Sequence, residues 1–437
     1  MKKWITNSIA VMMLTVISQI LGYVREILFA YYLGTSAPLE AFQMAETVPM
    51  LFTQILISAV PLALTPLLVK EYENGERNEL INNAILLFTA IMFAIMVLIM
   101  WKTEWFVRIV APGFIGDKFY LTCRLTTILA PNVLLLSLAS LFNAYLSAKE
   151  EFIVPTTIYL ILNIFIVVAQ ILTKANVYYV AIASLSASIT VFIMLLCFIY
   201  KRYTFKMEIS LFNIEKMLVI GKTVLPVCII SMFSSLNLML DKFFASMCGN
   251  GSVVVFTYSY KIINLPVFLF TMSITKVMLP NITKLINRNS LDELAGILRN
   301  IFSICIVGGL AGGIIIAALS YPIIGLLFGH GEFNDQAIAR TSECLQIFGF
   351  GIAGMALSTF CQSIAYAFGN YFEPFKVLVI QICIYILIAA GTNAILGVKG
   401  IALANVIAYI LATVIWGIIL QKKYKIRLFF NNSINKK

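Results

Sequence analysis

The chain has 437 residues, of which 61% are hydrophobic and 12% are charged, and its formal net charge is +11. Soluble globular proteins carry about 25% charged residues, so this composition excludes an ordinary soluble protein and indicates a chain that crosses a membrane many times. The basic residues lie between apolar segments, where they are typical of topology signals and of attraction to anionic lipid headgroups. We therefore expect membrane lipids as partners and no nucleic acid. The single histidine, His330, excludes histidine-based metal sites and argues against Ser-His-Asp chemistry, so no metal or cofactor is expected.

Apolar segments of about 20 residues, the length that a spanning helix needs, recur along the whole chain. They predict an all-α polytopic membrane protein with about twelve transmembrane helices. The expected spans are 5–32, 40–69, 80–101, 119–146, 153–173, 178–200, 217–246, 252–282, 295–321, 337–367, 374–396 and 399–421.

Lysine and arginine are unevenly divided between alternate gaps. The richer set of gaps includes Lys70 with Arg77, and Lys284 with Arg288, and both ends of the chain are basic. Loops rich in Lys and Arg face the cytoplasm in multi-pass proteins. Both termini are therefore predicted to be cytoplasmic. The outer gaps 102–118 and 322–336 are predicted to be the longest loops.

The second half of the sequence repeats the first. Residues 126–155 align with 345–374 without a gap, at an offset of 219 residues, and 65–80 align with 279–294 at an offset of 214. Six spans is an even number, so the two halves have the same orientation. The repeat predicts two parallel six-helix lobes, 1–215 and 216–437, related by an axis along the membrane normal, with a transport pathway between them.

Ionisable and amide side chains inside the apolar segments gather in the first two spans of each half. A charge at mid-membrane costs about 2.5–3.5 kcal/mol on insertion scales, so several together indicate an internal cavity with a function. The candidates are Arg25, Glu26, Glu40, Gln43 and Glu46 in the first half and Asp241, Lys261 and Asn264 in the second.

Arg25 and Lys261 come from different halves and suggest a shared site for a diphosphate, since Arg binds phosphate bidentately and Lys acts as a point charge. Gln43 and Asn264 are candidates for hydrogen bonds to sugars. Structural alternatives remain: Arg25 pairing with Glu26 or extending to the interface, and Glu40 stabilising a helix N-terminus. Asp241 is either an interfacial residue or, with Glu46, a ligand for a coupling ion.

The opening stretch resembles the MurJ/MviN family of lipid II flippases. The family pattern S-x-x-L-G-x-x-R-[DE] matches Ser18 to Glu26, and Glu40-Ala41-Phe42 matches an acidic residue before A-F. The segment Tyr258 to Pro266 is similar to the family's Y-x-x-R-L-x-x-x-P, with Lys261 at the arginine, and Gly331-Glu332-Phe333 resembles its [GR]-x-F segment.

The resemblance implies a V-shaped pair of six-helix lobes that alternates between inward- and outward-open states. Such a protein moves an undecaprenyl-diphosphate-linked saccharide, lipid II first, across the bacterial plasma membrane for peptidoglycan synthesis. Such a protein is a transporter and not an enzyme. We expect it to be monomeric, and the membrane potential or a coupled monovalent cation is a candidate source of direction for the transport. The family's diphosphate-binding residues map to Arg25 and Lys261, and a family acid maps to Glu40.

The sequence also departs from the family pattern. Family arginines are replaced by Gln19 and by Thr53-Gln54, and a family acid is replaced by Ser58. A less cationic cavity leaves room for another lipid-linked unit, from capsule, exopolysaccharide or O-antigen. A cation-coupled multidrug antiporter would instead use Glu26, Glu46 and Asp241. A membrane glycosyltransferase would need longer outer loops than this chain has.

Overall fold

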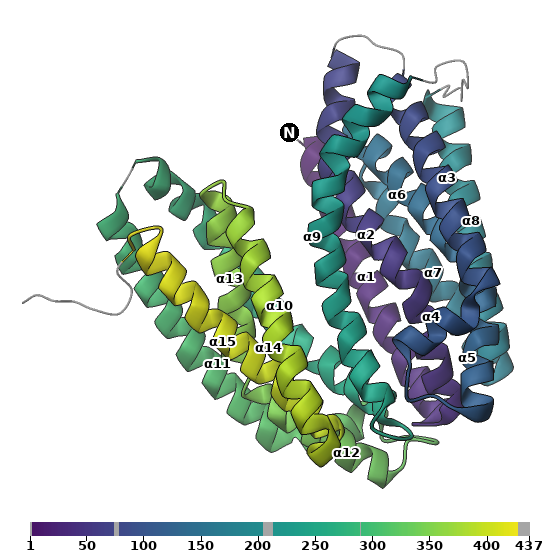
Figure 1. The fold of residues 1–437 in the computed structure, drawn as a ribbon. Coiled ribbons are helices and arrows are strands. Elements are labelled where there is room, and N and C mark those ends of the chain that lie inside the picture. The colour runs from purple at the N-terminus through teal and green to yellow at the C-terminus, as the bar shows by residue number, and fades with distance from the viewer. Residues whose placement is uncertain (1, 74–77, 204–212, 289, 427–437) are drawn as a thin grey trace, which may run out of the picture. The chain divides into compact units, whose positions relative to one another are not determined.

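The computed structural model describes residues 2–73, 78–203, 213–288 and 290–426, with side chains from Ser8 onward (Figure 1). Regular structure in these ranges is entirely helical. Eleven helical segments are long and apolar enough to cross a membrane, and one bent helix pair can supply a twelfth span. The prediction of an all-α polytopic membrane protein is confirmed.

The chain forms two compact units. Unit 1 comprises Met1–Phe243 with His330–Phe333, and unit 2 comprises Phe244–Gly329 with Asn334–Lys437. This division falls inside a helix, whereas the repeat predicts a boundary at 215. The predicted symmetry axis between the lobes stays a prediction.

Unit 1 is built around one long helix, α2, which packs against α5 and α6, while α1 packs against α7. A break at Ala130–Pro131 separates α5 from α6, which together form one span. Its helices are α1 (Lys2–Leu33), α2 (Ala37–Glu73), α3 (Glu79–Trp101), α4 (Thr103–Val110), α5 (Gly116–Leu129), α6 (Asn132–Ala148), α7 (Ile153–Thr173), α8 (Val177–Tyr203) and most of α9 (Ile214–Ser246).

The segment His330–Phe333 belongs to unit 1 because it packs on the turn between α1 and α2. The Glu332 N–H donates to the Tyr31 carbonyl oxygen at 2.9 Å. Gly34 in that turn has φ 54°, and a Cβ there would collide with the Glu332 backbone. Glycine is therefore needed at this position both for its conformation and for the close approach.

Unit 2 has the same kind of packing, with α10 against α12 and α13, and α13 against α11 and α15. The helices α12 and α13 are bent by 52° at Phe350–Gly351. Trp416 is buried in the core of the unit. Its helices are α10 (Ser252–Asn287), α11 (Leu291–Phe328), α12 (Asp335–Gly349), α13 (Ile352–Ala367), α14 (Phe372–Leu396) and α15 (Val398–Lys422).

Helix boundaries repeat at the offsets that the sequence alignment gave. The starts of α5 and α12, at Gly116 and Asp335, lie 219 residues apart. The ends of α6 and α13, at Ala148 and Ala367, have the same separation. The helix break at Pro131 corresponds to the break at Phe350. The aligned segments therefore have matching local structure in both units.

The two longest predicted loops are partly helical, so this prediction is wrong in detail. Helix α4 occupies much of 102–118, and α11 continues to Phe328. An eight-residue amphipathic helix is too short to be recognised as a span. Helix α11 extends past the apolar segment predicted at 295–321, because the backbone hydrogen bonds of a helix do not depend on the membrane boundary.

Candidate functional site

Arg25 and Glu26 form an ion pair on α1. The Arg25 guanidinium donates to Glu26 Oε1 from Nη2 at 2.8 Å and from Nε at 3.3 Å. The Arg25 side chain is 21% exposed, whereas that of Glu26 is 6% exposed. The pair confirms the contact that the sequence offered as a structural alternative. The partial exposure of Arg25 also lets an anion approach the guanidinium, so binding remains compatible with the pair.

Amide side chains of α7 fix the register of α1. Gln170 Nε2 donates to the Arg25 carbonyl oxygen at 3.0 Å, and Asn163 Nδ2 donates to the Ser18 carbonyl oxygen at 3.0 Å. Gly22 lies between these two contacts, and a Cβ there would meet Asn163 at ordinary contact distance. The two hydrogen bonds hold the α1 backbone beneath Arg25.

Glu40 is fully buried at the start of α2 and forms an ion pair with Lys118 of α5. The Lys118 ammonium also lies 3.9 Å from the Phe114 ring centroid, a cation–π contact. Removing one member of a buried ion pair costs about 3–5 kcal/mol because the other charge is left without compensation. This geometry favours a structural role for Glu40, and its assignment to the substrate stays a prediction.

Lys242 of α9 reaches α2 one turn beyond Glu40. Its ammonium donates to Thr47 Oγ1 at 2.8 Å and to the Gln43 carbonyl oxygen at 3.2 Å. Thr47 Oγ1 in turn donates to the same carbonyl at 2.7 Å. The Lys242 ammonium is thus held beside α2 by a hydroxyl oxygen and a carbonyl oxygen of that helix.

The Gln43 amide is an unusual feature of this stretch. The side chain is buried, and neither Nε2 nor Oε1 has a hydrogen-bond partner within the described ranges. Leaving a buried polar group unsatisfied costs about 1–3 kcal/mol. Buried amides of this kind call for a specific explanation, and a hydroxyl-rich ligand would satisfy them.

Two further carboxylates lie in the same unit. Glu46, three residues after Gln43 on α2, is half-buried and has no ion-pair or hydrogen-bond partner in the part of the chain that the structure describes. Asp241 precedes Lys242 on α9 and is 1% exposed. We call the side chains of Arg25, Glu26, Glu40, Gln43, Glu46, Thr47, Lys118, Asp241 and Lys242 the polar cluster of unit 1.

In unit 2, Lys261 and Asn264 are half-buried on α10. The turn before them is tightly packed: Tyr258 is buried and stacks on Phe328, with ring centroids 4.5 Å apart. Ser259 Oγ donates to the Thr341 carbonyl oxygen at 2.9 Å, which ties α10 to α12. Because Arg25 and Lys261 belong to different units, their shared diphosphate site stays a prediction.

Sequence reasoning missed two members of the cluster. Lys118 lies at the end of the predicted outer loop 102–118, and Lys242 is not among the candidate residues. The signal that would have found Lys118 is its place in the first turn of the helix that begins at Gly116, four residues after Phe114. For Lys242 the signal is its position next to Asp241, inside an otherwise apolar helix.

A helical chain with many spans, two compact units and a polar cluster buried within the spans defines a polytopic membrane transporter. The sequence model for the lipid II flippase MurJ family matches residues 29–436. The chain belongs to the MurJ lipid II flippase family.

The sequences of relatives agree with this placement. A probable lipid II flippase MurJ from Rhizobium tropici is 26% identical over 435 residues, which cover 93% of this chain and 78% of that protein. One from Buchnera aphidicola subsp. Baizongia pistaciae is 26% identical over 380 residues, covering 84% and 74%.

The fold is shared with two kinds of solved transporter. A lipid II flippase MurJ in an inward closed conformation matches with a TM-score of 0.82 and 24% identity, over 96% of this chain and 88% of that one. An inward-facing multidrug resistance MATE family transporter matches with a TM-score of 0.73 and 14% identity, over 96% and 98%.

Proposed function

We propose that this protein translocates lipid II, an undecaprenyl-diphosphate-linked saccharide, across the bacterial plasma membrane by alternating access. Membership of the MurJ family is the observation that carries the proposal. The protein acts as a transporter and breaks no covalent bond. Both termini lie in the cytoplasm, the protein works as a monomer, and it needs no cofactor.

Arg25 is the group that binds the diphosphate in this proposal. Its guanidinium is partly exposed and already oriented by Glu26 and by the α7 amides. A diphosphate oxygen competes with Glu26 for the same N–H donors, and charge-assisted hydrogen bonds of this kind are the strong ones. Lys261 supplies a second positive charge from unit 2.

The saccharide is recognised by amides. The buried Gln43 amide lacks a partner in the described structure, and Asn264 is half-buried on α10. A sugar hydroxyl both donates and accepts, so it satisfies either end of an amide. The undecaprenyl tail stays in the bilayer while the head moves.

Glu46 and Asp241 are the proposed coupling residues. Both carboxylates lie within membrane-spanning helices, and Glu46 has no partner among the described side chains. Ionisable residues within spans are typical of ion and proton pathways. A monovalent cation at one of these carboxylates, or the membrane potential alone, would drive the cycle.

Depletion of the protein in its own host, followed by mass spectrometry of polyprenyl-diphosphate-linked precursors, tests the proposal. We expect lipid II to accumulate and wild-type protein to reverse the accumulation. Accumulation of a different lipid-linked oligosaccharide would instead identify a capsule, exopolysaccharide or O-antigen flippase. If no precursor accumulated in a host without a redundant flippase, the cation-coupled antiporter would take first place.

A further inference from the structure

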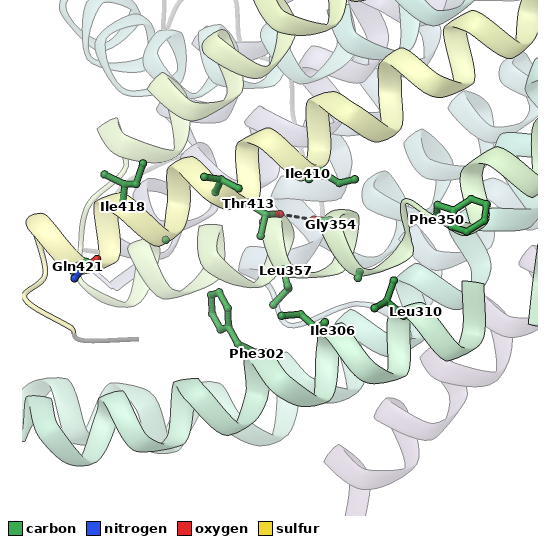
Figure 2. A pocket seen from close by; sticks show the side chains of 13 residues that line it. Phe302, Ile306, Leu310, Phe350, Gly354, Leu357, Ile410, Thr413, Ile418 and Gln421 are labelled. Atoms are coloured by element: carbon green, nitrogen blue, oxygen red, sulfur yellow. Dashed lines mark hydrogen bonds between the residues drawn. The ribbon is translucent and has the colours of Figure 1, made fainter. Parts of the chain in front are cut away.

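Unit 2 contains an apolar groove that the translocation mechanism does not use. It has a volume of about 410 Å³ and lies between α11 and α15, with α13 as its floor (Figure 2). Its lining side chains on α15, from Ile410 to Gln421, recur every three or four residues and so occupy one face of the helix. Phe302, Ile306 and Leu310 line it from α11 at the same helical spacing.

Small residues of α13 make the groove deep. Ala353 and Gly354 form part of the floor, and Thr413 Oγ1 donates to the Gly354 carbonyl oxygen at 2.9 Å. The same hydroxyl also contacts the Tyr409 carbonyl oxygen at 2.9 Å. The Thr413 hydroxyl therefore has hydrogen-bond acceptors within the protein, so an apolar occupant of the groove does not leave it unsatisfied.

The groove is open along the surface of unit 2. Its rim side chains are 46% exposed at Leu310, 54% at Val414 and 47% at Ile418. Helices α11 and α15 are both long and apolar enough to cross a membrane. The groove therefore opens into the hydrocarbon region, where the available occupant is a lipid chain.

The length of the groove matches one leaflet. The twelve residues from Ile410 to Gln421 span about 16 Å, since they are eleven steps apart at a helical rise of about 1.5 Å per residue. Half of a bilayer core is about 15 Å. The Gln421 end reaches the end of α15, and the other end lies near the middle of the span.

Two basic residues lie beside the Gln421 end of the groove along its helices. Lys422 follows directly and is exposed, and Arg299 lies one helical turn before Phe302 on α11. The Glu373 carboxylate forms ion pairs with the ammonium of Lys423 at 2.6 Å and with that of Lys376 at 3.3 Å. Basic side chains at the end of a span attract anionic lipid headgroups by about 1 kcal/mol each.

We propose that this groove binds one acyl chain of an anionic phospholipid, whose headgroup lies at Lys422 and Arg299. The bound lipid completes the outer surface of unit 2 between α11 and α15. The site is independent of the proposed flippase activity, since none of its residues belongs to the polar cluster of unit 1.

Photocrosslinking tests this proposal. The purified full-length protein is reconstituted with phosphatidylglycerol that carries a diazirine in the middle of one acyl chain, and crosslinked peptides are mapped by mass spectrometry. We expect crosslinks concentrated on groove residues of α11, α13 and α15. The same diazirine on phosphatidylcholine should crosslink several-fold less, and Lys422→Gln should reduce the difference between the two lipids.

Two matched variants separate the groove from ordinary lipid contact. Val414→Trp fills the groove, whereas Val307→Trp places the same side chain on the lipid-facing surface of α11 outside it. We expect groove crosslinks to fall about tenfold in the first variant, because overpacking excludes the chain, and to be unchanged in the second. Equal crosslinking at Val307 and in the groove, or loss of the signal on addition of undecaprenyl phosphate at equal concentration, would overturn the proposal.

Discussion

The same helix contact is built differently in the two units. In unit 1, α2 meets α5 through the buried ion pair of Glu40 and Lys118. At the offsets of the internal repeat, the corresponding positions in unit 2 are Val254 and Ala337, which are 0% and 3% exposed. These two side chains are apolar. The polar links between α10 and α12 lie at other positions, where Arg340 Nη2 donates to Ser252 Oγ at 2.9 Å and Ser259 Oγ donates to the Thr341 carbonyl oxygen at 2.9 Å.

This difference shows that the repeated fold accepts apolar residues at the positions of Glu40 and Lys118. Replacing a buried ion pair by well-packed apolar residues is often neutral or stabilising. A stable contact at this place can therefore be built without the Glu40–Lys118 ion pair. We infer that the polar cluster of unit 1 has a functional role in addition to its structural contacts.

The largest expected effect comes from Arg25→Ala. We expect translocation to be lost, because the variant removes the proposed diphosphate-binding group, whose charged hydrogen bonds contribute about 1.5–3 kcal/mol each. Arg25→Lys should keep partial activity, since it retains the charge and loses the bidentate geometry. Complementation of a depleted host and outer-leaflet lipid II are the readouts.

Arg202→Ala is the matched control for Arg25. Arg202 also pairs with a glutamate, Glu151, at 2.8 Å, but its side chain is 55% exposed and lies outside the polar cluster. This variant should translocate normally. Equal losses in both variants would show that any arginine in unit 1 matters for insertion or folding, and would remove the case for Arg25.

The next prediction tests whether apolar residues can replace the Glu40–Lys118 ion pair of unit 1. Lys118→Ala alone should lower the free energy of unfolding by about 3–5 kcal/mol, because the buried Glu40 carboxylate loses its ion pair with Lys118. The double variant Glu40→Val with Lys118→Ala, which copies unit 2, should recover most of that loss. Thermal unfolding in detergent measures the stability of both variants. A double variant as unstable as Lys118→Ala would show that apolar residues cannot replace the ion pair in unit 1.

Gln43→Leu should separate stability from function. The change removes a buried amide without partners in the described structure, so stability should be unchanged or rise by about 1 kcal/mol. Translocation should fall, because the saccharide loses its amide. Unchanged translocation with higher stability would mean that Gln43 has no contact with the substrate.

The smallest expected effect is that of Thr47→Val. The change removes the hydroxyl that accepts from Lys242 and should cost about 1 kcal/mol of stability. The Gln43 carbonyl still accepts from Lys242, so α9 should stay attached to α2. A loss as large as that of Lys118→Ala would indicate that Thr47 is central to the cluster.

Much of the fold could be predicted from the sequence, because hydropathy and repetition act over many residues. The span predicted at 153–173 coincides with α7, and the segments that the repeat aligned, 126–155 and 345–374, contain matching helix breaks near Pro131 and Phe350. Helix α4 could not be predicted in this way, because eight amphipathic residues give too weak a periodic signal.

The candidate site was only partly predictable. Arg25 and Glu26 are neighbours in sequence, so their pairing was foreseeable. The partner of Glu40 lies 78 residues away in a segment that topology had assigned to a loop. The unsatisfied amide of Gln43 is a property of packing, and no local pattern in the sequence indicates it.

The most direct test of the central claim is the fraction of lipid II in the outer leaflet of cells that depend on this protein. An impermeant enzyme that cleaves exposed lipid II measures it in intact cells. With wild-type protein or Arg202→Ala, we predict that lipid II becomes accessible and is cleaved. With Arg25→Ala at equal membrane abundance, it should stay protected. Lipid II cleaved equally in cells with Arg25→Ala and with wild-type protein would contradict the account.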